Sequence, residues 1–99
     1  MLSGKAEIKF TLDGKNYTAS DQFRIAFMFA EGLLFSGTIR SEDNEYVQGK
    51  LYNVDIEFFT IENEAYQAIQ PLLKKDMRLT MCAGKRVLGF AKLLDFDYN

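Results

Sequence analysis

The stretch that decides the fold is AGKRVLGFAKLL, residues Ala83 to Leu94. It opens with a glycine and two cations, which suit a tight turn, and then alternates between apolar and polar residues before it becomes apolar. The preceding run, DMRLTMC, places Met77, Leu79 and Met81 on one face of an extended chain. Two such runs joined by a glycine-containing turn predict a β-hairpin at this end of the sequence.

The same period-two alternation recurs upstream. KAEIKFTL, for example, places Ala6, Ile8 and Phe10 on one face, with charged residues between them. Further strands are predicted at residues 5–12, 22–30, 33–39 and 50–61. Residues 62–76 are the exception, because Tyr66 and Ile69 have helical spacing. Pro71 interrupts any long helix there, so at most a turn or two is expected. About six strands predict an all-β chain, folded as a small antiparallel barrel or sandwich.

Composition narrows the class of protein further. Ninety-nine residues predict a single domain, residues 1–99, and 47% hydrophobic residues suffice for one core. The formal net charge of −2 does not favour nucleic acid or an anionic membrane as a partner. Cys82 is the one cysteine, so no internal disulfide can form, and we see neither a signal peptide nor an apolar run long enough to span a bilayer. We therefore expect a cytoplasmic protein without membrane contact.

The absence of histidine restricts the chemistry that the chain can perform. It removes the commonest metal ligand and the usual general base, so neither a metal site nor a histidine-based nucleophile is expected. Without such a base, Cys82 is interpreted as a buried structural thiol. Asp55 and Glu57 alternate on one strand and would share a face, as the carboxylate pair of a hydrolase would, but a solvated strand face gives the same pattern. We predict that the protein is not an enzyme and holds no cofactor.

Three segments of the chain match the motifs of a known family. Residues 84–89, GKRVLG, stand where that family has G-G-R-T-V-G, and residues 13–29, DGKNYTASDQFRIAFMF, align without a gap with G-G-R-H-T-P-F-F-S-G-Y-R-P-Q-F-Y-F. YVQGKLYNVDIEFFTIENEA looks like its M-P-G-D-N-V-x-M-x-V-x-L-I-x-P-I-A. In these segments the chain resembles the C-terminal β-barrel domain of elongation factor Tu. The resemblance covers nearly the whole chain and implies a six-stranded antiparallel Greek-key barrel.

The departures from that family concern function. The GTPase domain and its G-x-x-x-x-G-K-[ST] motif are missing, so no nucleotide is expected. Asn16 stands where the family has a histidine and Thr18 where it has a proline, in the loop that lies on the family's surface for tRNA and exchange-factor contact. The candidate partner-binding residues, from matched segments, are Lys15, Asn16, Arg24, Lys85 and Arg86. Their cations would form a patch for a phosphate or an acidic partner if they converge, or would be ordinary solvated charges if they do not.

Two further groups of side chains allow more than one interpretation. Carboxylates gather in two predicted loops and would form an acidic face for a basic protein, or simply keep the loops solvated: Glu42, Asp43, Glu45, Glu62 and Glu64. Four tyrosines could offer stacking surfaces for nucleic-acid bases, although packing in the core or at the barrel rim is favoured: Tyr17, Tyr46, Tyr52 and Tyr66. Lys92 replaces an apolar residue of the family and is expected at a sheet edge or with its ammonium reaching solvent.

The sequence thus predicts a stand-alone, non-catalytic binding module. We expect its partner to be another protein, in or near translation, with RNA as the other candidate. Pairing of edge strands would also allow the chain to form oligomers. The alternative is a small immunity or inhibitor protein that neutralises a basic toxin, which the acidic loops and the lack of an active site would suit.

Overall fold

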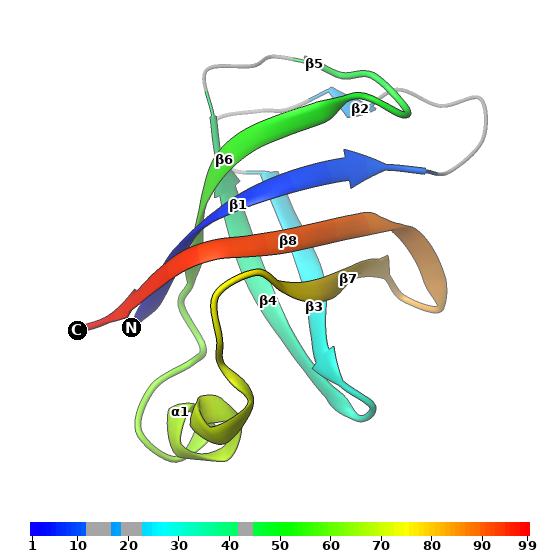
Figure 1. The fold of residues 1–99 in the computed structure, drawn as a ribbon. Coiled ribbons are helices and arrows are strands. Elements are labelled where there is room, and N and C mark those ends of the chain that lie inside the picture. The colour runs from blue at the N-terminus through cyan, green and yellow to red at the C-terminus, as the bar shows by residue number, and fades with distance from the viewer. Residues whose placement is uncertain (12–16, 19–22, 42–44) are drawn as a thin grey trace.

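The computed structural model describes residues 1–11, 17–18, 23–41 and 45–99, and of residues 17, 18, 23 and 24 it describes the backbone alone. Strands dominate this part of the chain, with one short α-helix and one 3₁₀ turn (Figure 1). The elements are β1 (Leu2–Phe10), β2 (Tyr17–Thr18), β3 (Phe23–Ala30), β4 (Leu33–Arg40), β5 (Glu45–Tyr46), β6 (Leu51–Phe58), α1 (Glu64–Ile69), η1 (Gln70–Leu72), β7 (Met77–Ala83) and β8 (Arg86–Tyr98).

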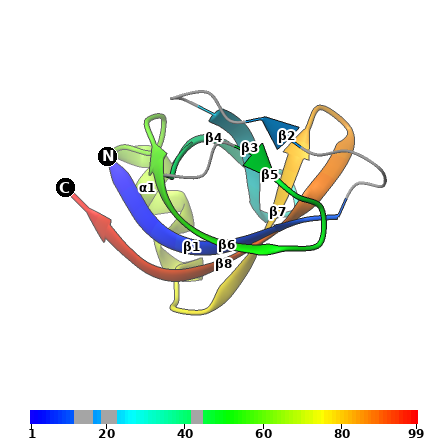
Figure 2. The same ribbon diagram turned by 90° about the horizontal axis from the view of Figure 1, so that it is seen from above.

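Six of the strands form a closed antiparallel barrel in the order β1-β6-β4-β3-β7-β8, and the short strands β2 and β5 pair separately. Seen from above, the six strands curve around a common interior (Figure 2). β3, β4 and β6 are neighbours in sequence and in space, and β7 returns across the barrel to lie beside β3. The spatial order β7-β3-β4-β6 is that of a Greek key. The predicted all-β class, six-strand count and antiparallel barrel are therefore confirmed.

Alternation in the sequence becomes alternation between core and solvent. Every second residue of β1, from Leu2 to Phe10, is buried, and so is every second residue of β6, from Tyr52 to Phe58. In β7 the inward residues are Met77, Leu79 and Met81, as the sequence predicts. Because successive side chains of a strand point to opposite faces, one register gives a continuous apolar interior and a polar exterior.

Aromatic rings fill the barrel at two levels. Phe29 and Phe58 meet edge to face with centroids 5.4 Å apart, and Phe27 contacts the same Phe58 ring, also at 5.4 Å. Near the β2–β5 end, the fully buried Tyr46 packs against Tyr52, with centroids 4.9 Å apart. Tilted and edge-to-face pairs of this kind add to the stabilisation from buried area.

The segment between β6 and β7 lies beside one end of the barrel (Figure 1). It contains α1 and, directly after it, η1, so the helical segment is longer than the turn or two expected. The α-helix nevertheless ends at Ile69, before Pro71, which lies in the 3₁₀ turn. Ile69 is fully buried, and Tyr66 stacks on Tyr98 of β8 with ring centroids 3.7 Å apart. The Tyr98 hydroxyl also accepts a hydrogen bond from the backbone N–H of Asn63 at 2.8 Å. These contacts attach the crossover to the last strand.

β8 closes the barrel because it is long enough to pair with both neighbours. Its thirteen residues pair with β7 on one side and with β1 on the other. The register shifts at Leu88 in the pairing with β7 and at Leu94 in the pairing with β1. Shifts of this kind bend a strand and increase its twist, which a barrel wall requires. Gly89, the glycine within the stretch AGKRVLGFAKLL, lies directly after the register shift at Leu88.

Gly89 allows β8 to approach β1 without a side chain between them. A Cβ at this position would lie 2.0 Å from the Lys9 carbonyl oxygen and 2.9 Å from the Phe10 Cα. Both contacts are with backbone atoms, so no side-chain rotation could relieve them. Next to this point, the backbone N–H of Thr11 donates to the Leu88 carbonyl at 2.9 Å.

We expect Gly89→Ala to reduce the free energy of unfolding by about 2 kcal/mol or more, because β1 must move to accept the methyl group. Urea denaturation followed by circular dichroism measures the change. The matched control is Val87→Ala in the same strand, where the side chain is exposed; it should change stability by no more than about 0.5 kcal/mol. Equal stability of the two variants would contradict the close approach of the backbones.

We expect Tyr52→Phe to lower the free energy of unfolding by about 1 kcal/mol. The hydroxyl of Tyr52 accepts a hydrogen bond from the backbone N–H of Val47 at 2.7 Å, and the substitution leaves this part-buried N–H without its acceptor. Tyr66→Phe is the control, since the Tyr66 ring stacks on Tyr98 and its hydroxyl makes no hydrogen bond in the described part of the chain. A denaturation midpoint for Tyr52→Phe equal to that of the control would argue against the bond.

Candidate binding surfaces

The outer face of the barrel carries its charged side chains in rows that cross the strands. One row runs from Arg78 in β7 through Lys92 in β8 to Glu7 in β1, each residue paired directly with the next. A second row runs from Asp95 in β8 through Lys5 in β1 to Asp55 in β6. Side chains in register on neighbouring strands lie within reach of one another. The composition of each row therefore sets the local charge.

The first row belongs to an open groove of about 390 Å³ on β1, β7 and β8. We call it the cationic groove; its residues are Glu7, Lys9, Thr11, Leu51, Asp76, Arg78, Phe90, Ala91 and Lys92. Its centre is Phe90, a half-buried ring on the outer face that pairs with Lys9 in β1. The carbon of the Arg78 guanidinium lies over this ring, 3.8 Å from its centroid. Three cations thus line one groove together with this aromatic ring and the carboxylates of Glu7 and Asp76.

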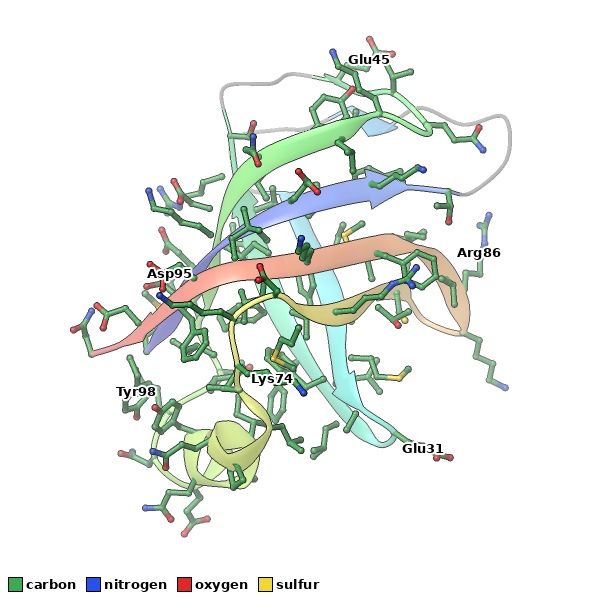
Figure 3. The ribbon with its side chains drawn as sticks, in the orientation of Figure 1. Glu31, Glu45, Lys74, Arg86, Asp95 and Tyr98 are labelled. Atoms are coloured by element: carbon green, nitrogen blue, oxygen red, sulfur yellow. The ribbon has the colours of Figure 1, made fainter. Side chains whose placement is uncertain are left out.

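The turn between β7 and β8 adds two more cations. Lys85 and Arg86 are both exposed, and Arg86 begins the strand that later carries Phe90 and Lys92 (Figure 3). Gly84 occupies the left-handed region at φ 61°, where glycine is favoured. Together, the cationic groove, Lys85 and Arg86 are called the cationic surface below.

The predicted partner-binding residues are described only in part. Lys15 and Asn16 lie outside the described residues. Arg24 is in β3, and its backbone lies two residues before Ala26, which pairs with Cys82 beside the turn that carries Lys85 and Arg86. The same end of the barrel thus holds the backbone of Arg24 and both cations of the turn. The Arg24 side chain is not among those described, so its convergence with the turn stays a prediction.

The opposite end of the same outer face is acidic. Four carboxylates occupy neighbouring strands and are called the acidic rows: Asp55, Glu57, Asp95 and Asp97. Lys5 separates Asp55 from Asp95, and Arg40 in β4 holds Glu57 through an Nε to Oε1 contact of 2.6 Å. An open groove of about 650 Å³ passes between Lys5, Arg40 and Asp55.

The carboxylate pair considered for hydrolysis belongs to these acidic rows. Asp55 lines the groove, whereas Glu57 is bound to Arg40. The two carboxylates have different surroundings but share the outer face, as the alternation predicts. The hydrolase hypothesis stays a prediction. Among the described residues, no group of three or more cysteine or carboxylate side chains could hold a metal ion.

The remaining acidic candidates lie apart from the acidic rows in sequence. Glu45 is exposed in β5, and Glu62 and Glu64 are exposed at the crossover that leads into α1. Glu42 and Asp43 lie outside the described residues. The predicted loop between β4 and β6 contains a short strand, β5, which the sequence analysis missed because two residues are too few for a periodic signal.

The structure also settles the position of several uncharged candidates. Tyr46 and Tyr52 are buried, so they are core residues, as favoured, and offer no stacking surface. Tyr66 is occupied by its stack with Tyr98, and the Tyr17 side chain is not described. Cys82 is a buried free thiol, as predicted.

Of the two expectations for Lys92, the sheet edge is wrong, because β8 has a neighbouring strand on each side. The side chain of Lys92 is exposed to solvent on the outer face, as the other expectation had it.

Sequence reasoning missed the cationic groove itself. Lys9, Arg78 and Lys92 come from three strands, and nothing in the sequence analysis joined them. Only the pairing of β7, β8 and β1 makes them neighbours. The available signal was Phe90, an aromatic residue on the polar side of its strand.

Comparison with known proteins does not identify a relative. No protein-family model matches this chain, and no curated protein matches it. Within the described residues, α1 is too short and too polar to traverse a lipid bilayer, and no longer helix occurs.

We expect a double-mutant cycle between Arg78→Ala and Phe90→Leu to give a coupling free energy of about 0.5 to 1 kcal/mol, the usual range for an exposed cation over an aromatic ring. The four proteins are compared by urea denaturation. Additive effects, with no coupling, would mean that the guanidinium does not rest on Phe90 in solution.

Proposed function

We propose that this chain is a non-catalytic binding module that holds an acidic macromolecule on its cationic surface. The observation that supports this most directly is the segregation of charge on one barrel wall. Five cations face two carboxylates on the cationic surface, although the whole chain has a net charge of −2. Grouped charge of one sign raises the rate and specificity of association with an oppositely charged partner.

The partner that we favour is a cytosolic protein. Leu51 is 55% exposed at the edge of the groove and offers an apolar contact beside the cations. The resemblance to the C-terminal barrel of elongation factor Tu supports a module that works by contact, in or near translation. RNA is the other candidate, since the same cations would contact phosphates.

An immunity or inhibitor function is the second candidate, and the acidic rows favour it. Their four carboxylates outnumber the three neighbouring cations, of which Arg40 pairs with Glu57 and Lys75 with Asp95, while Lys5 stands between Asp55 and Asp95. A basic toxin would dock against this end of the barrel. The two hypotheses therefore place the partner at opposite ends of the same face.

The test is capture of partners from native lysate by the tagged protein, at low and high salt, with both protein and RNA identified. We expect an acidic partner whose capture is lost in the Lys9→Glu/Lys92→Glu variant. The control is Lys74→Glu, the same type of substitution outside the groove, which should retain the partner; Lys75 is left unchanged because it pairs with Asp95. Figure 3 places Lys74 below β8, away from Arg86. Circular dichroism verifies that each variant is folded.

The outcomes separate the candidates. Capture that weakens steeply with salt and disappears after ribonuclease treatment would indicate RNA. A basic protein, retained by Lys9→Glu/Lys92→Glu and lost from Asp55→Lys/Asp97→Lys, would support the inhibitor function and refute the favoured one. Equal capture of the acidic partner by both lysine variants would also refute it.

A further inference from the structure

We propose that Arg78, resting on Phe90, anchors a site for a phosphate monoester, and that this phosphate is carried by a phosphorylated side chain of the protein partner. The proposal rests on the proposed function and specifies the group that the cationic surface takes. Four features of the groove support it: the position of the guanidinium, its lack of a carboxylate partner, the cations beside it, and the occupied face of the ring.

The guanidinium is already oriented. Its carbon lies 3.8 Å from the centroid of the Phe90 ring, so the ring fixes one face of the planar group. Stacking of this kind leaves the N–H groups around the edge of the plane available for hydrogen bonds. A fixed guanidinium loses little conformational freedom when it forms two parallel bonds to the oxygens of one anion.

No carboxylate of the described residues neutralises this guanidinium. The ion pairs in that part of the chain join the N-terminus to Glu62, Arg40 to Glu57, and Lys75 to Asp95. Glu7 and Asp76 line the groove, yet neither lies within salt-bridge distance of Arg78. The exposed guanidinium therefore retains its capacity for an anion from outside.

Two ammonium groups are placed beside it by the strand register. Lys92 pairs directly with Arg78, and Lys9 pairs directly with Phe90. Like charges opposite each other in a sheet are destabilising, and Glu7, on the far side of Lys92, offsets only part of this repulsion. An anion bound between the three cations would replace this repulsion with attraction.

The number of cations favours phosphate over a carboxylate. A phosphate monoester carries between one and a half and two negative charges near neutral pH and presents three acceptor oxygens, whereas a carboxylate has one charge and two oxygens. Arg78, Lys9 and Lys92 can meet the three oxygens from different sides. Phosphoserine and phosphothreonine place such a group on a polypeptide.

The covered face of Phe90 favours a polypeptide over a nucleic acid. Proteins that bind single strands stack bases on exposed aromatic faces, but Arg78 covers one face of this half-buried ring. The other uncharged members of the groove are Thr11, Leu51 and Ala91, and none of them can stack a base. Leu51 can instead contact an apolar side chain of an extended peptide.

The experiment titrates the ¹⁵N-labelled chain of residues 1–99 with inorganic phosphate, then with O-phosphoserine and with adenosine 5′-monophosphate. We expect phosphate and phosphoserine to shift the amide signals of residues around Arg78 and Phe90. Arg78→Lys keeps the charge and loses the planar fork, so it should weaken phosphoserine binding by about tenfold. Phe90→Leu should also weaken phosphoserine binding, because the guanidinium of Arg78 then loses the ring that orients it. Lys74→Glu, outside the groove, should leave phosphoserine binding unchanged.

Several results would overturn the proposal. Unchanged affinity in Arg78→Lys would show that the fork is not the anchor, and binding of unphosphorylated serine or acetate as strong as that of phosphoserine would show no selection for phosphate. Preference for the nucleotide over phosphoserine would exclude the polypeptide carrier. If phosphatase treatment of the lysate leaves capture of the acidic partner intact, the site proposal fails while the binding function stands; if no acidic partner is captured at all, both fail.

Discussion

The barrel depends on the close approach of two paired backbones, at the point where Gly89 of β8 lies opposite Phe10 at the end of β1. Gly89 permits this contact, because any Cβ would collide with the Lys9 carbonyl oxygen. The register shift at Leu88 bends β8 just before this contact. Beyond the end of β1, the backbone N–H of Thr11 donates a hydrogen bond to the Leu88 carbonyl and so continues the pairing. Closure pairs the edges that an open sheet of these strands would expose. The oligomer formation expected from edge strands stays a prediction.

The same pairing determines where charge lies on the outer face. Because β8 lies between β7 and β1, its Lys92 stands next to Arg78 and its Asp95 stands next to Lys5. A shift of one residue in either pairing would turn inward side chains outward and destroy both the core and these rows. Stability and surface chemistry are thus set by one register. A substitution that disrupts the pairing of β8 with β1 is expected to disturb the cationic groove as well as the core.

A barrel of this kind offers a rigid platform on which strands, rather than loops, hold the binding groups. Phe90 and Arg78 lie on paired strands, and their backbones are fixed by the ladder between β7 and β8. Side chains on regular strands are positioned more accurately than side chains on long connections. Fold does not dictate function, so the proposed binding function rests on the charged rows of the outer face and not on the barrel itself.

The sequence by itself determined the six long strands, most of their inward residues and the all-β antiparallel class, while it left the choice between a barrel and a sandwich open. It could do so because alternation is local: Ile8, Ile56 and Leu79 are buried for the same reason that their neighbours are exposed. It also identified the turn that bears Lys85 and Arg86 from its glycine and its flanking runs. Only the tertiary structure decided that Lys9, Arg78 and Lys92 line one groove with Phe90, and that β8, which carries Lys92, lies between β7 and β1. Those relations join residues from strands that are distant in sequence, and a strand order and a register, which no local pattern encodes, are needed to bring them together.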